Sequence, residues 1–266
     1  MNKMIPLAAL GASALIAGLA FSGFSRSGAQ DAGGGSDVFS DAQTEEIERL
    51  VADYIKDNPK TIIDALVAFE EDERRMAEAR QDAALGAATD YLVSNQGAYT
   101  AGTDVDNAEI AVVEFFDYHC GYCKRAKGLV MELTNGDPAV KVVFRELPIL
   151  RKESETAARY ALAAREQGKY LDLHFGLLDA SGTLSESRIL KIAEDKGLDI
   201  DALKKAADAA ALDDQLADNN EVAQDIGVNG TPGFVIARID GGYTEVVGGF
   251  NPDGVRKAIA AAKKAK

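Results

Sequence analysis

The sequence contains few residues of the kinds that bind metal ions, and few tracts that bind nucleic acid or cross a membrane. Its 266 residues include only two cysteines and two histidines, and so few ligands argue against a zinc site with four protein ligands. No basic tract, internal repeat or second long apolar span is present. The 43 acidic residues outnumber the 29 basic ones, and a net charge of −14 argues against binding to nucleic acid or anionic lipid.

The chain has no cysteine to spare for a distant disulfide. Cys120 and Cys123 are three residues apart, and a bridge across so short a loop would contribute only about 2 kcal/mol to stability, less than the roughly 3 kcal/mol of a 15-residue loop. The spacing therefore indicates a dithiol that reacts. The apolar run 110–116 predicts a buried strand before the pair, and the composition of 124–133 predicts a helix after it.

A dithiol at the start of a helix has two chemically different thiols. The unpaired amides and the positive end of the helix dipole stabilise a thiolate, which is the form that attacks disulfides. We expect Cys120, the more exposed of the two, to be the nucleophile. Cys123, one turn into the helix and shielded, is then expected to resolve the mixed disulfide.

The first residues of the chain predict export. Lys3 is followed by an uncharged stretch from residue 4 to residue 25, and small residues at 27 and 29 suit a cleavage site after Ala29. We expect residues 1–29 to be a signal peptide, with an uncleaved membrane anchor as the alternative. Either outcome predicts a periplasmic location, where disulfides persist. Removal of this segment would change the formal charge from −14 to −16. The Gly- and Ser-rich composition of residues 30–40 predicts a flexible linker.

Residues 41–94 predict two amphipathic helices. Between residues 43 and 57 the apolar positions recur at intervals of three and four, and a second helix is expected from Pro59 toward Leu92. These helices are too slender to bury their own apolar faces. The pattern leaves two alternatives open, an arm that packs on its own domain and a region that forms oligomers.

The segment 95–266 predicts an α/β domain that contains the dithiol. A second strand is expected at 140–146, a helical insert at about 153–225, two further strands at 234–239 and 243–247, and a last helix at 252–262. The motif Gly230-Thr231-Pro232 lies just before the third of these strands. His174 falls within the insert and is expected to be a packing residue.

This order of elements resembles the thioredoxin fold in its DsbA-like form, over about residues 99–266. The matching features are the strand, the CxxC motif and the helix at 110–133, the helical insert, and Thr231-Pro232 before a ββα end. The resemblance implies that Pro232 is cis beside the dithiol, and that the backbone of Thr231 pairs with a substrate strand. It also implies that Glu114, six residues before Cys120, helps proton transfer at Cys123.

The details of the motif resemble disulfide isomerases more than disulfide oxidases. Gly121-Tyr122 between the cysteines and a threonine before Pro232 are similar to the DsbC isomerase, whereas the DsbA oxidase has a histidine in its dipeptide and a valine before its cis-proline. Because Tyr122 supplies no positive charge to a thiolate, a milder redox poise is expected. The N-terminal helices resemble the oligomerisation region of the ScsC group, which favours a homo-oligomer.

The expected function is that of an exported thiol-disulfide isomerase or reductase without a cofactor or metal. Its expected partners are exported proteins that contain cysteine and a membrane protein that resets the dithiol, and not nucleic acid. Two alternatives remain. One is a monomeric DsbA-like oxidase, and the other is a holdase whose dithiol is incidental or binds copper(I).

Overall fold

The structure is a computed structural model that describes residues 39–265. The predicted signal segment 1–29 and most of the predicted linker lie outside these residues. None of the helices within the described range is both long and apolar enough to cross a membrane. The chain divides into two compact units between Ile63 and Asp64.

The two predicted N-terminal helices are present as α1 (Asp41–Asp57) and α2 (Pro59–Val93). Helix α1 begins earlier than the apolar pattern predicts because Ser40 and Gln43 cap each other. The Ser40 hydroxyl accepts from the Gln43 amide, and the Gln43 side chain accepts from the Ser40 amide at 2.9 Å. No residue of α1 is buried, whereas α2 buries Leu85, Leu92 and Val93.

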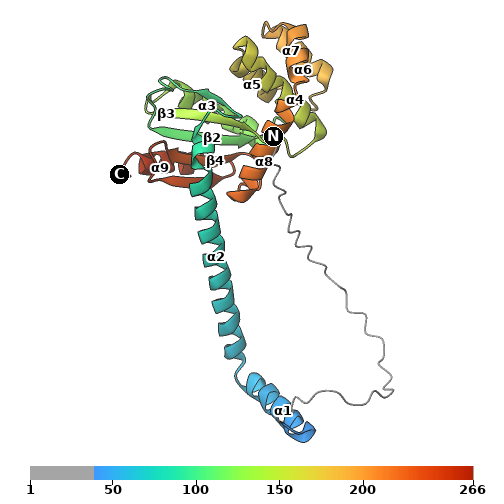
Figure 1. Cartoon of the computed structure of the whole chain (residues 1–266), viewed down its shortest axis with the longest axis vertical. Coiled ribbons are helices and arrows are strands. Elements are labelled where there is room, and N and C mark those ends of the chain that lie inside the picture. Colours follow the sequence, from blue (N-terminus) through green and yellow to red (C-terminus); the bar gives the residue numbers. More distant parts are fainter. Residues whose placement is uncertain (1–38, 266) are drawn as a thin grey trace, which may run out of the picture. The chain divides into compact units, whose positions relative to one another are not determined.

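A five-stranded sheet forms the centre of the second unit (Figure 1). Strand β2 runs parallel to β3, and every other neighbouring pair is antiparallel. All seven residues of β2 are buried, as expected for a central strand with both faces covered. In order across the sheet the strands are β1 (Tyr99–Ala101), β3 (Val140–Glu146), β2 (Ile110–Phe116), β4 (Gly233–Arg238) and β5 (Thr244–Gly248).

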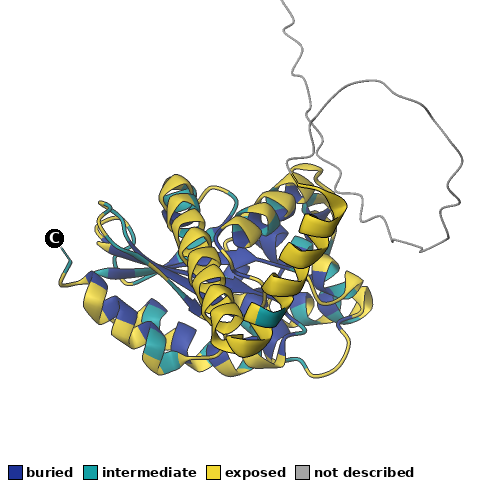
Figure 2. Ribbon diagram, turned by 90° about the horizontal axis from the view of Figure 1, so that it is seen from below, coloured by how far each residue is buried: buried dark blue, intermediate teal, exposed yellow. Residues whose placement is uncertain are grey.

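Helices cover the sheet and also form the insert between β3 and β4. Helix α3 (Gly121–Asn135) follows β2, and α9 (Pro252–Ala262) ends the domain. Figure 2 shows the buried strands in dark blue between helices whose outer faces are exposed. The insert consists of α4 (Lys152–Ala163), the 3₁₀ helix η1 (Ala164–Gln167), α5 (Tyr170–Asp179), α6 (Glu186–Asp195), α7 (Ile200–Ala207) and α8 (Ala211–Asp225).

The two faces of β2 belong to two different hydrophobic clusters. Because side chains alternate along a strand, Val112 and Phe116 join the larger cluster with α3, α9 and much of the insert, while Val113 and Phe115 join the smaller one. The smaller cluster also contains Leu85 of α2. The later part of α2 is therefore part of the core of the α/β unit.

A buried arginine fastens the end of α2 to the sheet. Arg145 of β3 has no exposed surface, and its guanidinium lies 3.9 Å from the centre of the Tyr91 ring. It donates to the carbonyls of Tyr91, Ser94 (3.2 Å) and Gln96 (2.5 Å), and to Asn219 Oδ1 (3.3 Å). Arg145 thus satisfies carbonyl groups that the end of a helix leaves without partners.

Candidate active site around Cys120 and Cys123

The dithiol lies where the sequence predicts it, between the end of β2 and the start of α3. Cys120 is the residue that caps α3, and Cys123 lies in its first turn. Both thiols are free. Cys120 is the more exposed of the two, as predicted, although only 6% of its surface is accessible, and Cys123 is completely buried. Cys120 is covered because the loop before β4 lies against it.

The environment of Cys120 favours its thiolate. The pKa of this thiol is lowered to about 5, first by the hydrogen bond with the Cys123 side chain. Burial opposes the shift, while the Thr231 side chain and the backbone amides of Cys123 and Tyr122 add to it. At neutral pH Cys120 is therefore ionised and ready to attack a disulfide.

The environment of Cys123 has the opposite effect. Burial raises the pKa of its thiol, and the nearby Cys120 and Glu114 raise it further. Glu114 lies on β2, is buried, and its Oε2 has no hydrogen-bond partner among the described residues. Burial and the charge of Cys120 raise the pKa of Glu114 to about 8. At neutral pH a proton is thus held on both Cys123 and Glu114.

The loop before β4 brings Thr231 and Pro232 against the nucleophile. The Cys120 thiol donates to the Thr231 carbonyl at 3.1 Å, and the peptide bond between Thr231 and Pro232 is cis. The Pro232 carbonyl accepts from the amide of Gly249 at 2.9 Å. The Thr231 hydroxyl is buried without a hydrogen-bond partner in the described part of the chain.

Several exposed apolar side chains lie on segments that adjoin the site. Gly121 and Tyr122 are exposed, and the Tyr122 ring lies 4.0 Å from the Arg125 guanidinium. Beyond α2, the exposed large apolar side chains among the described residues are those of Tyr122, Met131, Ile149, Leu150 and Phe250. All but Met131 belong to segments that form the site, since Leu150 bonds to Asp117 and Phe250 follows Gly249.

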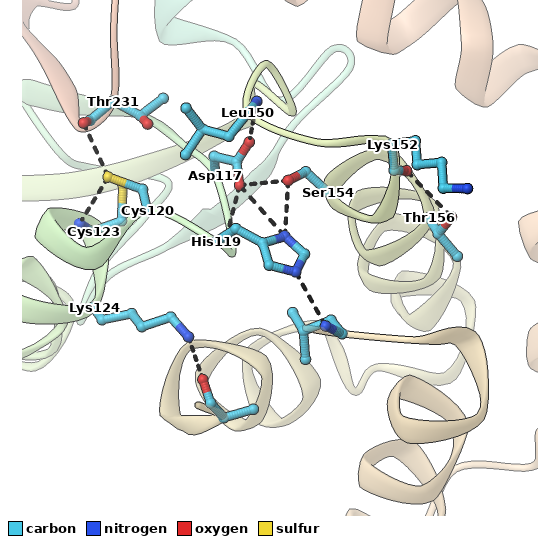
Figure 3. A network of polar contacts seen from close by, with 12 residues as sticks. Asp117, His119, Cys120, Cys123, Lys124, Leu150, Lys152, Ser154, Thr156 and Thr231 are labelled. Atoms are coloured by element: carbon cyan, nitrogen blue, oxygen red, sulfur yellow. Dashed lines mark hydrogen bonds and ion pairs between the residues drawn. The ribbon is translucent and has the colours of Figure 1, made fainter. Parts of the chain in front are cut away.

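Sequence reasoning missed a buried polar network beside the dithiol (Figure 3). Asp117 accepts from the His119 amide and the Ser154 hydroxyl, both at 2.7 Å, and from the Leu150 amide at 3.0 Å. Its carbonyl accepts from the Cys120 amide at 3.0 Å. The network fixes the turn that carries Cys120. The available signal was an aspartate two residues before His119, a spacing that is typical of an Asx turn.

His119 is held away from the two sulfur atoms. Its Nε2 accepts from the Leu184 amide at 3.1 Å, so the proton is assigned to Nδ1, which lies 2.9 Å from the Ser154 hydroxyl. Burial lowers the pKa of His119, and the ring is neutral. The side chain therefore links the dithiol turn to the insert and does not point toward the thiols.

His174 lies in the core, as predicted, but it also has a polar partner. Its ring stacks on Tyr170 at 5.6 Å between centres, and Nδ1 lies 3.0 Å from the Tyr118 hydroxyl. Burial lowers the pKa of His174 to about 3. The hydroxyls of Tyr118 and Tyr170 both donate to Glu146 Oε1. Burial raises the pKa of Glu146 to about 8, which keeps this cluster uncharged at neutral pH.

No group of three or more His, Cys, Asp or Glu side chains in residues 39–265 is arranged to hold a metal ion. Among the described residues, the soft ligands at the site are the two thiols. With both histidines held by other partners, the arrangement can carry out thiol-disulfide exchange with its own side chains.

Comparison with known families identifies two segments. Residues 111–260 match the DSBA-like thioredoxin domain, and residues 43–75 match the copper resistance protein ScsC N-terminal domain. The first match contains the dithiol, Glu114 and the Thr231-Pro232 loop. The predicted DsbA-like thioredoxin fold, with an insert and N-terminal helices of ScsC type, is confirmed.

Solved structures and curated sequences also match parts of this chain. A thioredoxin-like oxidoreductase from Silicibacter pomeroyi is 39% identical, with a TM-score of 0.59 over 66% of this chain and 98% of that chain. BcfH from Salmonella enterica Typhimurium is 29% identical, with a TM-score of 0.64 over 84% of this chain and 96% of that chain. A Na⁺/H⁺ antiporter NhaA 3 from Salinispora tropica is 32% identical over 48% of this chain. The match spans about a fifth (20%) of the antiporter's length.

Proposed function

We propose that this chain, which belongs to the family of DSBA-like thioredoxin domains, is an exported thiol-disulfide isomerase or reductase. Its proposed substrates are protein disulfides. The observation that carries the proposal is the contrast between its two thiols. Cys120 is ionised at neutral pH, with a pKa lowered to about 5, whereas the pKa of Cys123 is raised. One thiol attacks, and the other stays protonated until it is needed.

The proposed reaction begins with the Cys120 thiolate. It attacks one sulfur of a substrate disulfide, a new bond forms between Cys120 and that sulfur, and the other substrate sulfur leaves as a thiolate. In isomerisation a different substrate thiolate then attacks the mixed disulfide and regenerates the Cys120 thiolate. In reduction Cys123 loses its proton and attacks Cys120, so that the substrate is released reduced and the dithiol becomes a disulfide.

Glu114 and Thr231 have supporting roles in this proposal. Glu114 accepts the proton that Cys123 loses in those molecules in which its carboxyl group is ionised, a fraction that grows as the pH rises toward its pKa of about 8. The backbone of Thr231 pairs with the extended substrate segment that carries the reacting sulfur. Four exposed apolar side chains on segments that adjoin the site favour unfolded polypeptide as the substrate class, namely those of Tyr122, Ile149, Leu150 and Phe250.

The pKa of Cys120 supports a redox poise between the extremes of this fold. Nucleophilic cysteines of CxxC motifs have pKa values from about 3.5 in strong oxidants to about 7 in reductants, and a more stable thiolate makes the protein more oxidising. A value of about 5 is intermediate. Such a poise suits an isomerase, which must attack substrate disulfides and also release the substrate.

The N-terminal helices are proposed to assemble copies of the chain into a homo-oligomer. Helix α1 and the first part of α2 carry large apolar side chains that are 39–62% exposed. Part of this segment, residues 43–75, matches the ScsC N-terminal domain. The exposed side chains of these two helices are Ile47, Leu50, Val51, Tyr54, Ile55, Ile62, Ile63, Leu66, Val67, Phe69 and Met76.

The proposed organisation follows the order of the chain. Residues 1–29 direct export to the periplasm, 30–40 act as a linker, 41–94 form the helical region, and 95–266 form the catalytic domain. A membrane protein is proposed to reset the dithiol after each reductive turnover. Because α2 buries Leu85, Leu92 and Val93, point substitutions are better tests of the helical region than its removal.

The test is the refolding of scrambled ribonuclease by the wild-type chain, by Cys120→Ser, by Cys123→Ser and by Leu50→Glu. An oligomeric isomerase rescues ribonuclease, loses this activity with Cys120→Ser, and becomes smaller and less active with Leu50→Glu. Oxidation of a reduced peptide without rescue of scrambled ribonuclease would indicate a monomeric DsbA-like oxidase. Protection against aggregation that survives Cys120→Ser, or binding of copper(I) by the thiols, would indicate the holdase or copper-binding alternative.

A further inference from the structure

The loop that leads from α8 to Thr231 has an external partner on α2. Within the loop, the amides of Gly227 and Val228 bond back to the last turn of α8, at 3.1 Å and 2.7 Å. The carbonyl of Ile226 instead has a partner outside the loop and α8, because it accepts a hydrogen bond from Gln81 Nε2 of α2 at 2.8 Å. Gln81 and Ile226 are 145 residues apart in the sequence. One end of the loop is therefore fixed by α8 and by a side chain of α2 together.

The fit between Gln81 and the loop is close. Gly227 has a φ of +79°, which favours glycine. A Cβ atom at this position would lie 2.7 Å from Gln81 Nε2, so glycine also leaves room for the Gln81 amide where it lies. One turn further along α2, Leu85 is buried in the same hydrophobic cluster as Ile226 and Val228. A polar contact and an apolar cluster of α2 thus both involve the short segment 226–228 of the loop.

Packing within the loop connects the segment held by α2 to Thr231. Val228 is buried, and a Cβ atom on Gly233 would lie 2.4 Å from Val228 Cγ1, so the two ends of the loop pack on each other. Thr231 lies between them. Its carbonyl accepts from the Cys120 thiol at 3.1 Å, and its buried hydroxyl has no partner in residues 39–265. A shift of the loop would therefore change the contacts of the nucleophilic sulfur.

We propose that Gln81 is a positioning residue for the dithiol, which acts through the loop 226–232 to hold Thr231 against Cys120. Gln81 lies between the two segments that match known families, 43–75 and 111–260, so neither match assigns it a role. Helix α2 then contributes to the reactivity of the site as well as to the helical region. The effect on Cys120 is independent of the function proposed above, whereas the effect on turnover depends on it.

The variant that tests this proposal is Gln81→Met in the full chain. Methionine has nearly the same length and helix propensity as glutamine but cannot donate to Ile226. The matched control is Arg80→Met, because Arg80 is the exposed neighbour of Gln81 on α2. Gln81→Ala provides a second variant that also removes the side-chain bulk. Thermal unfolding of each protein confirms that the fold is retained.

The first readout is the thiolate absorbance of Cys120 as a function of pH, with the rate of alkylation at pH 5. We expect Gln81→Met and Gln81→Ala to move the titration to higher pH and to slow alkylation about two- to fivefold, because the Thr231 side chain, which lowers the pKa of Cys120, would no longer be held beside the sulfur. Arg80→Met should cause no change. A titration curve and an alkylation rate equal to wild type in both Gln81 variants would overturn the proposal. Equal slowing by Arg80→Met would also overturn it, because the effect would then be a general property of α2.

The second readout is kinetic and separates the two proposals. With a disulfide-containing peptide as substrate, KM is expected to rise in Gln81→Met, since Thr231 would present its backbone less well to the peptide. If wild type itself fails to exchange disulfides while the Cys120 titration still depends on Gln81, the proposed function fails and the positioning role stands. If wild type is active and neither titration nor KM depends on Gln81, the positioning role fails alone.

Discussion

The Cys120 thiol donates a hydrogen bond of 3.1 Å to the carbonyl of Thr231, a residue 111 positions further along the chain. The hydroxyl of the same threonine is buried without a partner among the residues described. The carbonyl and the hydroxyl of Thr231 suit different protonation states of the Cys120 sulfur. The carbonyl accepts from the thiol, and the hydroxyl can donate to the thiolate after the proton has left. Thr231 thus has a contact for each protonation state of Cys120.

The first prediction concerns that hydroxyl. Thr231→Val removes the donor and is expected to raise the pKa of Cys120 by about one pH unit, because a hydrogen bond to a charged group is worth about 1.5–3 kcal/mol and one unit corresponds to about 1.4 kcal/mol. The measurement is thiolate absorbance against pH. Thr231→Ser keeps the hydroxyl and should titrate near wild type. Unchanged titration in Thr231→Val would mean that this hydroxyl does not stabilise the thiolate.

A second prediction concerns the buried carboxyl of Glu114. Its pKa is about 8 in the folded chain against an ordinary value of 4.5, so the native state binds more protons than the unfolded state between these pH values. The free energy of unfolding therefore falls as pH rises through this window. Glu114→Gln removes the titration, and its stability relative to wild type should increase from pH 5 to pH 9.

Urea unfolding of the reduced proteins at several pH values measures this difference. Glu155→Gln serves as the control, because it makes the same substitution at an exposed position, where a change in stability of less than about 0.5 kcal/mol is expected. The same Glu114→Gln protein should also release a mixed disulfide more slowly, since Cys123 would lose its proton acceptor. A constant stability difference between pH 5 and pH 9 would contradict the raised pKa of Glu114.

The third prediction concerns the network under the dithiol. Ser154→Ala leaves the His119 Nδ1 proton and one acceptor site of Asp117 without a partner in a buried region, at a cost of about 1–3 kcal/mol in the free energy of unfolding. Ser187→Ala, at an exposed position of α6, should cost less than about 0.5 kcal/mol. Denaturant unfolding compares them, and equal stabilities would show that the network contributes little.

A fourth prediction concerns Arg145. Arg145→Met removes the donors for three carbonyls near the end of α2 and should destabilise the α/β unit, because each buried acceptor left without a donor costs about 1–3 kcal/mol. Arg145→Lys should not restore stability, because an ammonium group cannot reproduce the planar set of donors over the Tyr91 ring. Arg256→Met is the control, since the Arg256 ion pair with Glu132 is exposed. Recovery of wild-type stability by Arg145→Lys would argue against the planar geometry.

Local sequence patterns predicted the elements around the dithiol well. The strands at 110–116 and 140–146 and the helix at 252–262 are present with the predicted bounds, because each is a continuous apolar or periodic run between clear breaks. The short strand β1 was not predicted, since its three residues have no strong pattern of their own. It forms because it pairs with β3.

The sequence by itself determined the order of the elements, the thioredoxin-like fold and the CxxC motif at the start of a helix, because these depend on residues that are close together in the chain. The tertiary structure alone decided that Cys120 is covered, that Thr231 contacts it, and that Gln81 and Arg145 fasten α2 to the catalytic unit. Each of these contacts joins residues about 50 to 145 positions apart. Such partners are chosen by packing across the whole domain, which leaves no periodicity or spacing to read in the sequence.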